Sequence, residues 1–217
     1  VEDGAVKVAL YGAGQVNGNV ARILSMRSGF TVLGPSGRQE RDRALQSGAD
    51  VVVIATTSFL RDVAPDITLA LRSGSNVITT AEEAAFPWAY STDIALEIDD
   101  LAKKLGLTVL GTGLNPGFAF DALVLTATSV AWDVATVRVE RVVDISGFSA
   151  AVLHRIGVGY RAEDFHEGVA KGTITGHIGF PQSMRIVAGA IGLDIERIDR
   201  LIEPRVATQR YDASHIS

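Results

Sequence analysis

The sequence predicts an α/β protein whose first half forms a doubly wound parallel sheet and whose second half forms an α+β domain. In the first half, short apolar runs alternate with helical patterns, an alternation that favours parallel strands joined by helices. The run "DVVVIAT" at residues 50–56 is apolar on both faces, as expected of a central strand covered by helices on both sides. After residue 115 the alternation gives way to a different pattern, which predicts a second domain.

The first half contains five strand-like runs and three helical patterns. The strands are expected at residues 6–11, 30–33, 50–55, 77–80 and 108–110, and the helices at residues 15–26, 63–72 and 93–105. The third helix has the most regular pattern, because Ile94, Ile98 and Leu101 share one face. Its acidic residues come early and its lysines late, an order that suits the helix macrodipole.

In the second half, Asn115 is expected to cap a helix that begins at Pro116 and runs to residue 128. Residues 136–144 alternate apolar and charged side chains, which predicts a half-exposed strand. Helices are also expected at residues 162–171 and 182–191, each ended by the glycine that follows. The predicted domains are residues 1–115 and 116–217. The short link between the second and third strands and the unfinished second sheet predict a truncated or a gapped chain.

The composition argues against several classes of function. A net charge of −5 and a pI near 5.4, without any basic run, argue against nucleic-acid binding. The chain has no cysteine, and its histidines lack the spacing of metal ligands, so no metal site is expected. No apolar run approaches the roughly 18 residues that cross a membrane. The first residues lack the basic start of a signal peptide, so the expected location is the cytoplasm.

The turn after the first strand has the sequence "GAGQVNG" at residues 12–18. A dinucleotide fingerprint places glycines between a first strand and a first helix, so that pyrophosphate can approach the helix N-terminus. Gly12 and Gly14 fit this pattern and Gln15 and Val16 follow at the helix start, whereas Asn17 stands at the third glycine position. We therefore expect these residues to bind a nicotinamide dinucleotide. A tight turn without a ligand is the alternative.

The end of the second strand distinguishes NAD from NADP in such folds, because it lies beside the adenosine ribose. An acid there favours NAD, whereas "PSGRQER" at residues 35–41 offers Ser36, Arg38 and Arg41. These groups favour the 2'-phosphate of NADP, with NAD as the second option. A solvated basic loop is the alternative.

Three later strand ends should meet at the same edge of the sheet, where open α/β sheets bind ligands. Hydroxyl residues follow the third strand, paired carboxylates the fourth, and a glycine-rich loop the fifth: Thr56, Thr57 and Ser58; Glu82 and Glu83; Gly113 and Asn115. We expect the first and last groups to contact the cofactor and the acids to meet a cationic substrate group. The alternatives are helix capping by Ser58 and a solvated turn for the acids.

Candidates for the wall of the substrate pocket come from both halves of the chain. They are Phe118, Phe148 and His177. Core packing is the alternative for the two aromatic residues, and a structural loop position is the alternative for the histidine.

Four stretches of the chain carry a family resemblance. They are "NVITTAEEAAFPW", "GTGLNPGF", "RVVDIS" and "GTITGHIGFPQSMRIVA". Together they resemble the native amine dehydrogenases and 2,4-diaminopentanoate dehydrogenase, which belong to the dihydrodipicolinate-reductase-like oxidoreductases. The resemblance implies a Rossmann domain, a substrate-binding and dimerisation domain, and a homodimer. It also implies NAD(P)H-dependent reductive amination of small ketones and aldehydes with ammonia, and the reverse oxidation of amines.

The same resemblance implies a catalytic carboxylate after the "TTAE" stretch. By register, Glu83 takes that position and Glu82 is second. Two alternatives remain: another NAD(P) oxidoreductase of the group, acting on diaminopentanoate or a cyclic imine, and an inactive nucleotide-binding fragment. Dihydrodipicolinate reductase itself is disfavoured, because His154 is followed by Arg155 and not by a second histidine.

Overall fold

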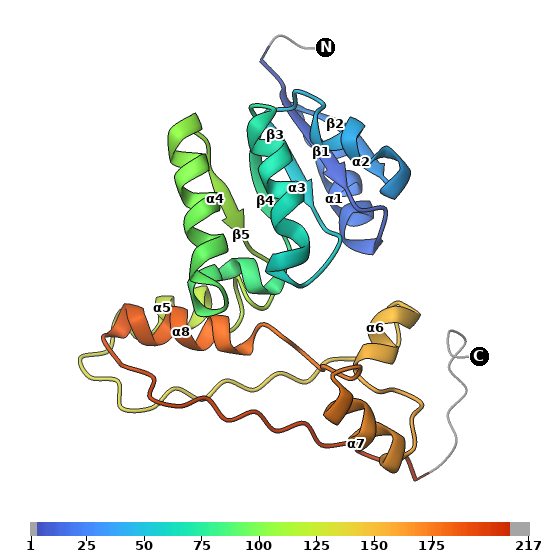
Figure 1. Ribbon diagram of the computed structural model, residues 1–217. Coiled ribbons are helices and arrows are strands. Elements are labelled where there is room, and N and C mark those ends of the chain that lie inside the picture. Colours follow the sequence, from blue (N-terminus) through green and yellow to red (C-terminus); the bar gives the residue numbers. More distant parts are fainter. Residues whose placement is uncertain (1–3, 209–217) are drawn as a thin grey trace. The chain divides into compact units, whose positions relative to one another are not determined.

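A computed structural model describes residues 4–208 of the chain. The chain forms two compact units (Figure 1). The first unit comprises residues 4–132 together with Gly179–Asp194, and the second comprises Asp133–Ile178 and residues 195–208. Within residues 4–208, no helix is both long and apolar enough to cross a membrane.

The first unit is built on a five-stranded parallel sheet with the order β2-β1-β3-β4-β5. The strands are β1 Val6–Tyr11, β2 Phe30–Ser36, β3 Val51–Ile54, β4 Asn76–Thr79 and β5 Val109–Gly111. All five strands predicted from the apolar runs are therefore confirmed, as is the Rossmann-type α/β class. The chain turns outward from β1 to β2 and then returns past β1 to β3, so the strand order reverses there. Such a switch point opens a crevice at the carboxyl ends of the strands.

Helices cover both faces of the sheet (Figure 1). They are α1 Gln15–Ser25, α2 Arg41–Leu45, α3 Leu60–Arg72 and α4 Thr92–Leu105. Successive side chains of a strand point to opposite faces, so Val8 and Leu10 of β1 pack towards α1, whereas Ala9 and Tyr11 pack with α2 and α3. Burial on both faces explains why the central strands β1 and β3 read as continuous apolar runs.

Two further helices join the first unit, α5 Ala122–Thr128 and α8 Phe180–Ile191, and they pack against each other. The predicted helix start at Pro116 is wrong: α5 begins at Ala122, and the Asp121 carboxylate accepts its N–H. Gly117 has a φ of +125°, and a Cβ there would lie 2.2 Å from the Gly113 nitrogen. The chain therefore folds back on itself at this glycine before a helix can begin.

The second unit contains the helices α6 Ala150–Arg155 and α7 Ala162–Lys171. The predicted end of α7 at Gly172 is confirmed, as is the end of α8 at Gly192, because both glycines adopt the left-handed conformation. Residues 136–144, in contrast, contain no strand. A strand needs a neighbouring backbone to complete its hydrogen bonds, and no described segment pairs with this one. Val142 is accordingly 91% exposed.

The compact units divide the chain differently from the predicted boundary after residue 115. Residues 116–132 and Gly179–Asp194 group with the sheet, because α5 and α8 pack together and α8 also contacts the turn after β4. The assignment of residues 1–115 to cofactor binding and of residues 116–217 to substrate binding and dimerisation stays a prediction.

Candidate active site

The turn between β1 and α1 is shaped by two glycines with different geometry. Gly12 has a φ of +112°, and a Cβ there would lie 2.2 Å from the carbonyl oxygen of Ala55. Gly14 is the N-cap residue of α1, and a Cβ at this position would meet nothing within 4 Å. The first turn of α1 contains no acidic residue. Gly12 thus permits close packing against the end of β3, and Gly14 leaves open space at a helix N-terminus, where an anion is favoured.

Asn17 occupies the third glycine position of the fingerprint and has a structural role there. Its side chain is fully buried, and its Nδ2 donates to the carbonyl oxygens of Tyr11 at 2.8 Å and Gly12 at 3.0 Å. The amide therefore ties the end of β1 to the first turn of α1. Gln15 and Val16, the other two predicted cofactor residues in this turn, are exposed at the helix start.

The end of β2 lies beside the glycine turn, because the Gly12 N–H donates to the Ser36 carbonyl at 2.9 Å. Arg38 follows in a short 3₁₀ helix, Arg38–Glu40, and its side chain is exposed. Arg41 is engaged elsewhere, since its guanidinium pairs with Asp66 at 2.6 Å and with Asp42 at 2.8 Å. Of the three predicted phosphate-binding groups, Ser36 and Arg38 thus suit that role and Arg41 does not.

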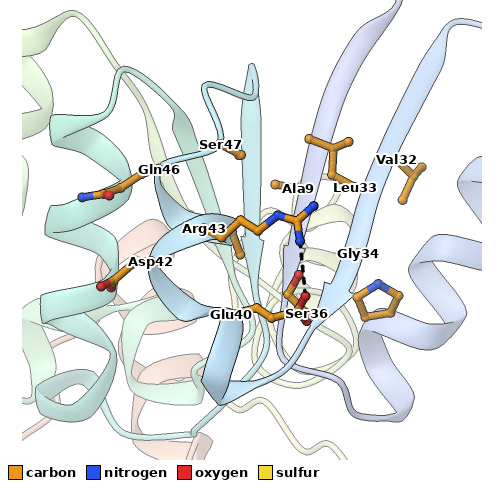
Figure 2. A pocket seen from close by; sticks show the side chains of 12 residues that line it. Ala9, Val32, Leu33, Gly34, Ser36, Glu40, Asp42, Arg43, Gln46 and Ser47 are labelled. Carbon is orange, nitrogen blue, oxygen red and sulfur yellow. Dashed lines mark ion pairs between the residues drawn. The ribbon is translucent and has the colours of Figure 1, made fainter.

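A groove of about 710 Å³ lies next to this strand end, between β2 and α2 (Figure 2). Arg43 and Glu40 form an ion pair along it at 3.7 Å. The short α2 helix covers only part of this side of the sheet, which leaves the groove open. The lining residues are Ala9, Val32, Leu33, Gly34, Pro35, Ser36, Glu40, Asp42, Arg43, Ala44, Gln46 and Ser47.

The loop after β3 faces the turn after β4. Thr56 is exposed, and the Thr57 hydroxyl oxygen accepts the N–H of Phe59 at 3.2 Å. Ser58 is buried, and its hydroxyl donates to Oε1 of Glu82 at 3.1 Å. The N-cap residue of α3 is Phe59, without a side-chain cap. The alternative that Ser58 caps α3 is therefore wrong.

Glu83 is a buried acid in the 3₁₀ turn η2, Glu82–Ala85, that follows β4. Glu83 is only 4% exposed, and its Oε2 accepts the N–H of Leu60, the first residue of α3, at 2.7 Å. Burial raises the pKa of the Glu83 carboxyl, the Leu60 hydrogen bond lowers it, and the nearby Asp62 and Glu82 charges raise it, with a net increase. The alternative of a solvated turn is therefore wrong for Glu83.

Glu82 is half-buried and joins three parts of the first unit. Besides the bond from Ser58, its Oε2 accepts the N–H of Gly179, the N-cap residue of α8, at 2.9 Å. A Cβ at Gly179 would lie 2.2 Å from Cδ of Pro116 and 3.3 Å from Cβ of Glu82. The absence of a side chain at residue 179 therefore lets the start of α8 approach this acid.

The glycine-rich loop after β5 closes against the same turn. A Cβ at Gly111 would lie 2.1 Å from the Ala84 carbonyl oxygen, whereas Gly113 is exposed. Asn115 is buried, and its Oδ1 lies 3.4 Å from the Ser183 hydroxyl. This loop and η2 are thus in backbone contact, as expected from the parallel ends of β4 and β5.

Two buried polar residues of this region were missed in the sequence. Asp121 accepts the Ser183 hydroxyl and the Gly117 N–H, both at 2.8 Å, and thereby holds the glycine-rich loop to α8. An aspartate directly before an apolar helix is a capping signal, so Asp121 was detectable. Ser183 had no signal, because its role depends on the packing of α8.

The predicted pocket residues fall in different units. Phe118 belongs to the first unit and is 54% exposed. Phe148 and His177 belong to the second unit and are half-buried, and the His177 carbonyl accepts a hydrogen bond from Arg200 at 3.1 Å. A shared pocket for the three residues stays a prediction.

Comparison with known proteins extends this description. A family model for the C-terminal domain of 2,4-diaminopentanoate dehydrogenase matches residues 118–217. The 2,4-diaminopentanoate dehydrogenase of Acetoanaerobium sticklandii is 35% identical over an alignment of 227 positions, which covers 93% of this chain. The chain is thus similar to 2,4-diaminopentanoate dehydrogenase in both comparisons. The family resemblance predicted from the four sequence stretches is thereby confirmed.

The chain spans 64% of the length of this curated relative. Its fold is similar to that of a solved amine dehydrogenase from Mycobacterium smegmatis, with a TM-score of 0.79 and 21% sequence identity. That match covers 97% of this chain and 69% of the solved one. The fold is thus shared with the solved amine dehydrogenase over nearly the whole chain.

Proposed function

We propose that the protein is a nicotinamide-dependent amine dehydrogenase, which aminates small ketones and aldehydes with ammonia and oxidises amines in reverse. The observation that carries the proposal is the position of Glu82. Its carboxylate lies at the carboxyl end of β4, bonded to the loop after β3 through Ser58 and to the start of α8 through Gly179. Open α/β sheets bind ligands beyond the carboxyl ends of their strands, so an acid at this edge is in a position to meet a substrate beside the cofactor.

The residues of the β1–α1 turn suit a dinucleotide. Gly14 leaves open space at the start of α1, and no acid in the first turn opposes a pyrophosphate. Gly12, Gln15 and Val16 would border the phosphates, Thr56–Ser58 the ribose side, and Gly113 and Asn115 the nicotinamide. When bound, the nicotinamide supplies the hydride for reduction or accepts it in oxidation.

Arg38 and Ser36 support a preference for NADP over NAD. Arg38 is exposed at the end of β2, and Ser36 is joined to the glycine turn through Gly12. A guanidinium in that position can hold a 2'-phosphate through charge-assisted hydrogen bonds. NAD remains the second option, since a guanidinium does not prevent binding of a ribose without the phosphate.

Of the two acids, we assign the substrate role to Glu82. The sequence register favoured Glu83, but that carboxylate is buried and directed at the Leu60 N–H. Glu82 is the more exposed of the two. As an anion it would stabilise a cationic iminium group and exchange a proton with the amine nitrogen, and such positioned proton transfer typically contributes about 10²–10⁴-fold in rate.

Absorbance of the reduced cofactor tests this function. The purified chain is mixed with a series of small ketones and aldehydes, ammonium chloride and either NADPH or NADH, with sodium chloride in place of ammonium as the control. We expect cofactor oxidation that depends on both carbonyl and ammonium. Cofactor oxidation that does not depend on ammonium, or no cofactor oxidation with any carbonyl, would contradict the proposal.

A second candidate substrate follows from the curated relative. Because that protein is named 2,4-diaminopentanoate dehydrogenase and is 35% identical, the oxidative direction should be tested with this diamino acid beside simple alkylamines. Reduction of cofactor by the diamino acid alone would favour the narrower activity. A homodimer and a cytoplasmic location remain part of the proposal.

A further inference from the structure

The turn η2 has an arrangement that its proposed chemistry does not require. Each of its two acids receives a backbone N–H from the start of a different helix: Leu60 of α3 donates to Glu83, and Gly179 of α8 donates to Glu82. Both helices are long, with 13 and 12 residues respectively. The turn is therefore held between two helix N-termini, where carboxylates are favoured.

Glu83 makes a closed hydrogen-bonded ring with the loop after β3. Its own N–H donates to the Ser58 carbonyl at 3.1 Å, and its Oε2 accepts the N–H of Leu60 at 2.7 Å. These two bonds bracket the three residues from Ser58 to Leu60. They fix where α3 begins, and with it the loop that contains Thr57 and Ser58.

The same loop is bonded to the other acid. The Ser58 hydroxyl donates to Glu82, so a displacement of Ser58 would also displace the Glu82 carboxylate. Glu83 is thus linked to both sides of the proposed site, although its own side chain is buried.

We infer that Glu83 is a positioning residue that holds the cofactor loop and the Glu82 carboxylate in one geometry. The inference rests on the proposed function, because it assigns the substrate carboxylate to Glu82. It requires Glu83 to act as a hydrogen-bond acceptor for Leu60 and requires no proton transfer by Glu83. A glutamine at this position retains an acceptor oxygen at the same reach, whereas an alanine does not.

Three variants of the full chain test the inference: Glu83→Gln, Glu83→Ala and Glu82→Gln. NADPH affinity is measured by fluorescence titration, and ammonium-dependent turnover by absorbance. We expect Glu83→Gln to stay within about threefold of the parent in both readouts. Glu83→Ala should lose about tenfold in NADPH affinity and about tenfold in turnover, because the Leu60 N–H is left without its acceptor. Glu82→Gln should lose about 10²-fold or more in turnover while keeping its NADPH affinity.

The opposite pattern would overturn the inference. If Glu83→Gln binds NADPH normally and has lost turnover as fully as Glu83→Ala, Glu83 is itself the catalytic acid. An alanine variant equal to the parent in both readouts would also overturn it. Should Glu83→Ala fail to fold, the glutamine variant alone still decides. If the parent shows no ammonium-dependent turnover, the proposed function fails, and the NADPH affinities of the two Glu83 variants still test the positioning role.

Discussion

At the end of β1 the chain leaves space, whereas at the end of β4 it fills space with carboxylates. A Cβ at Gly14 would meet nothing within 4 Å. In η2, by contrast, Glu82 and Glu83 together accept hydrogen bonds from Ser58, Leu60 and Gly179. Both turns follow strands of the same sheet. An anionic ligand needs the first kind of turn, and a cationic reacting group needs the second.

The difference also concerns how each turn keeps its shape. In the β1–α1 turn, Asn17 is bonded to the carbonyls of Tyr11 and Gly12, and Gly12 also donates to the Ser36 carbonyl at the end of β2. The η2 turn depends on residues far away in the sequence, such as Gly179, which is 97 positions from Glu82. A substitution in η2 should therefore also act on α8, far away in the sequence.

The largest expected effect comes from introducing a carboxylate into the β1–α1 turn. Gly14→Asp would put a carboxylate into the open space at the start of α1 and lower NADPH affinity by roughly 100-fold or more, because it opposes the pyrophosphate. The fold should survive, since a Cβ fits there. Fluorescence titration measures the affinity, with circular dichroism as the check on folding.

Gly18→Asp is the matched control for this prediction. Residue 18 also has room for a Cβ and lies one turn further into α1. Its loss of affinity should be much smaller. Equal losses in both variants, or unchanged affinity in Gly14→Asp, would mean that the glycine turn does not bind the pyrophosphate.

A moderate effect is expected at the 2'-phosphate of NADPH. Arg38→Ala should weaken NADPH about tenfold, the value of one charge-assisted hydrogen bond, and leave NADH nearly unchanged. Arg43→Ala is the control, because Arg43 is an exposed arginine of the same segment that pairs with Glu40. Equal loss of both cofactors in Arg38→Ala would remove the preference for NADP.

The smallest effect is a pH dependence of stability that distinguishes Glu83 from an ordinary surface acid. Burial raises the pKa of this carboxyl above its ordinary value of 4.5. Its contribution to stability is therefore full below that ordinary value and is lost as pH rises through the raised pKa. The melting temperature of Glu83→Gln, relative to the parent, should rise as the pH increases from below 4.5 through the raised pKa of Glu83. A constant difference would contradict the burial of an ionisable group there.

The centre of the sheet was predictable because β1 and β3 are buried on both faces and read as apolar runs such as "VVVI" in β3. The ends of α7 and α8 were predictable because Gly172 and Gly192 supply the left-handed conformation at a helix end. The strand expected at residues 136–144 is absent because no described segment pairs with these residues. Alternating side chains describe a face, but a strand also needs a pairing partner.

The roles of the two acids could not be separated by sequence. Strand alternation would place Glu82 and Glu83 on opposite faces, but β4 ends at Thr79 and both acids lie in a 3₁₀ turn, where that rule no longer applies. Which acid is buried depends on where α3 and α8 begin. The helix after Asn115 was misplaced for a similar reason, since Gly117 packs on the backbone of Gly113.

Chemical rescue tests most directly the central claim that Glu82 meets the amine and Glu83 holds the site. Glu82→Ala and Glu83→Ala are assayed for ammonium-dependent turnover with sodium formate, and with sodium chloride as the control. A small carboxylate can replace a missing acid where substrate binds, so formate should restore turnover in Glu82→Ala by about tenfold or more. It should not restore Glu83→Ala, whose defect is the altered position of the loop. Rescue of Glu83→Ala without rescue of Glu82→Ala would contradict the claim.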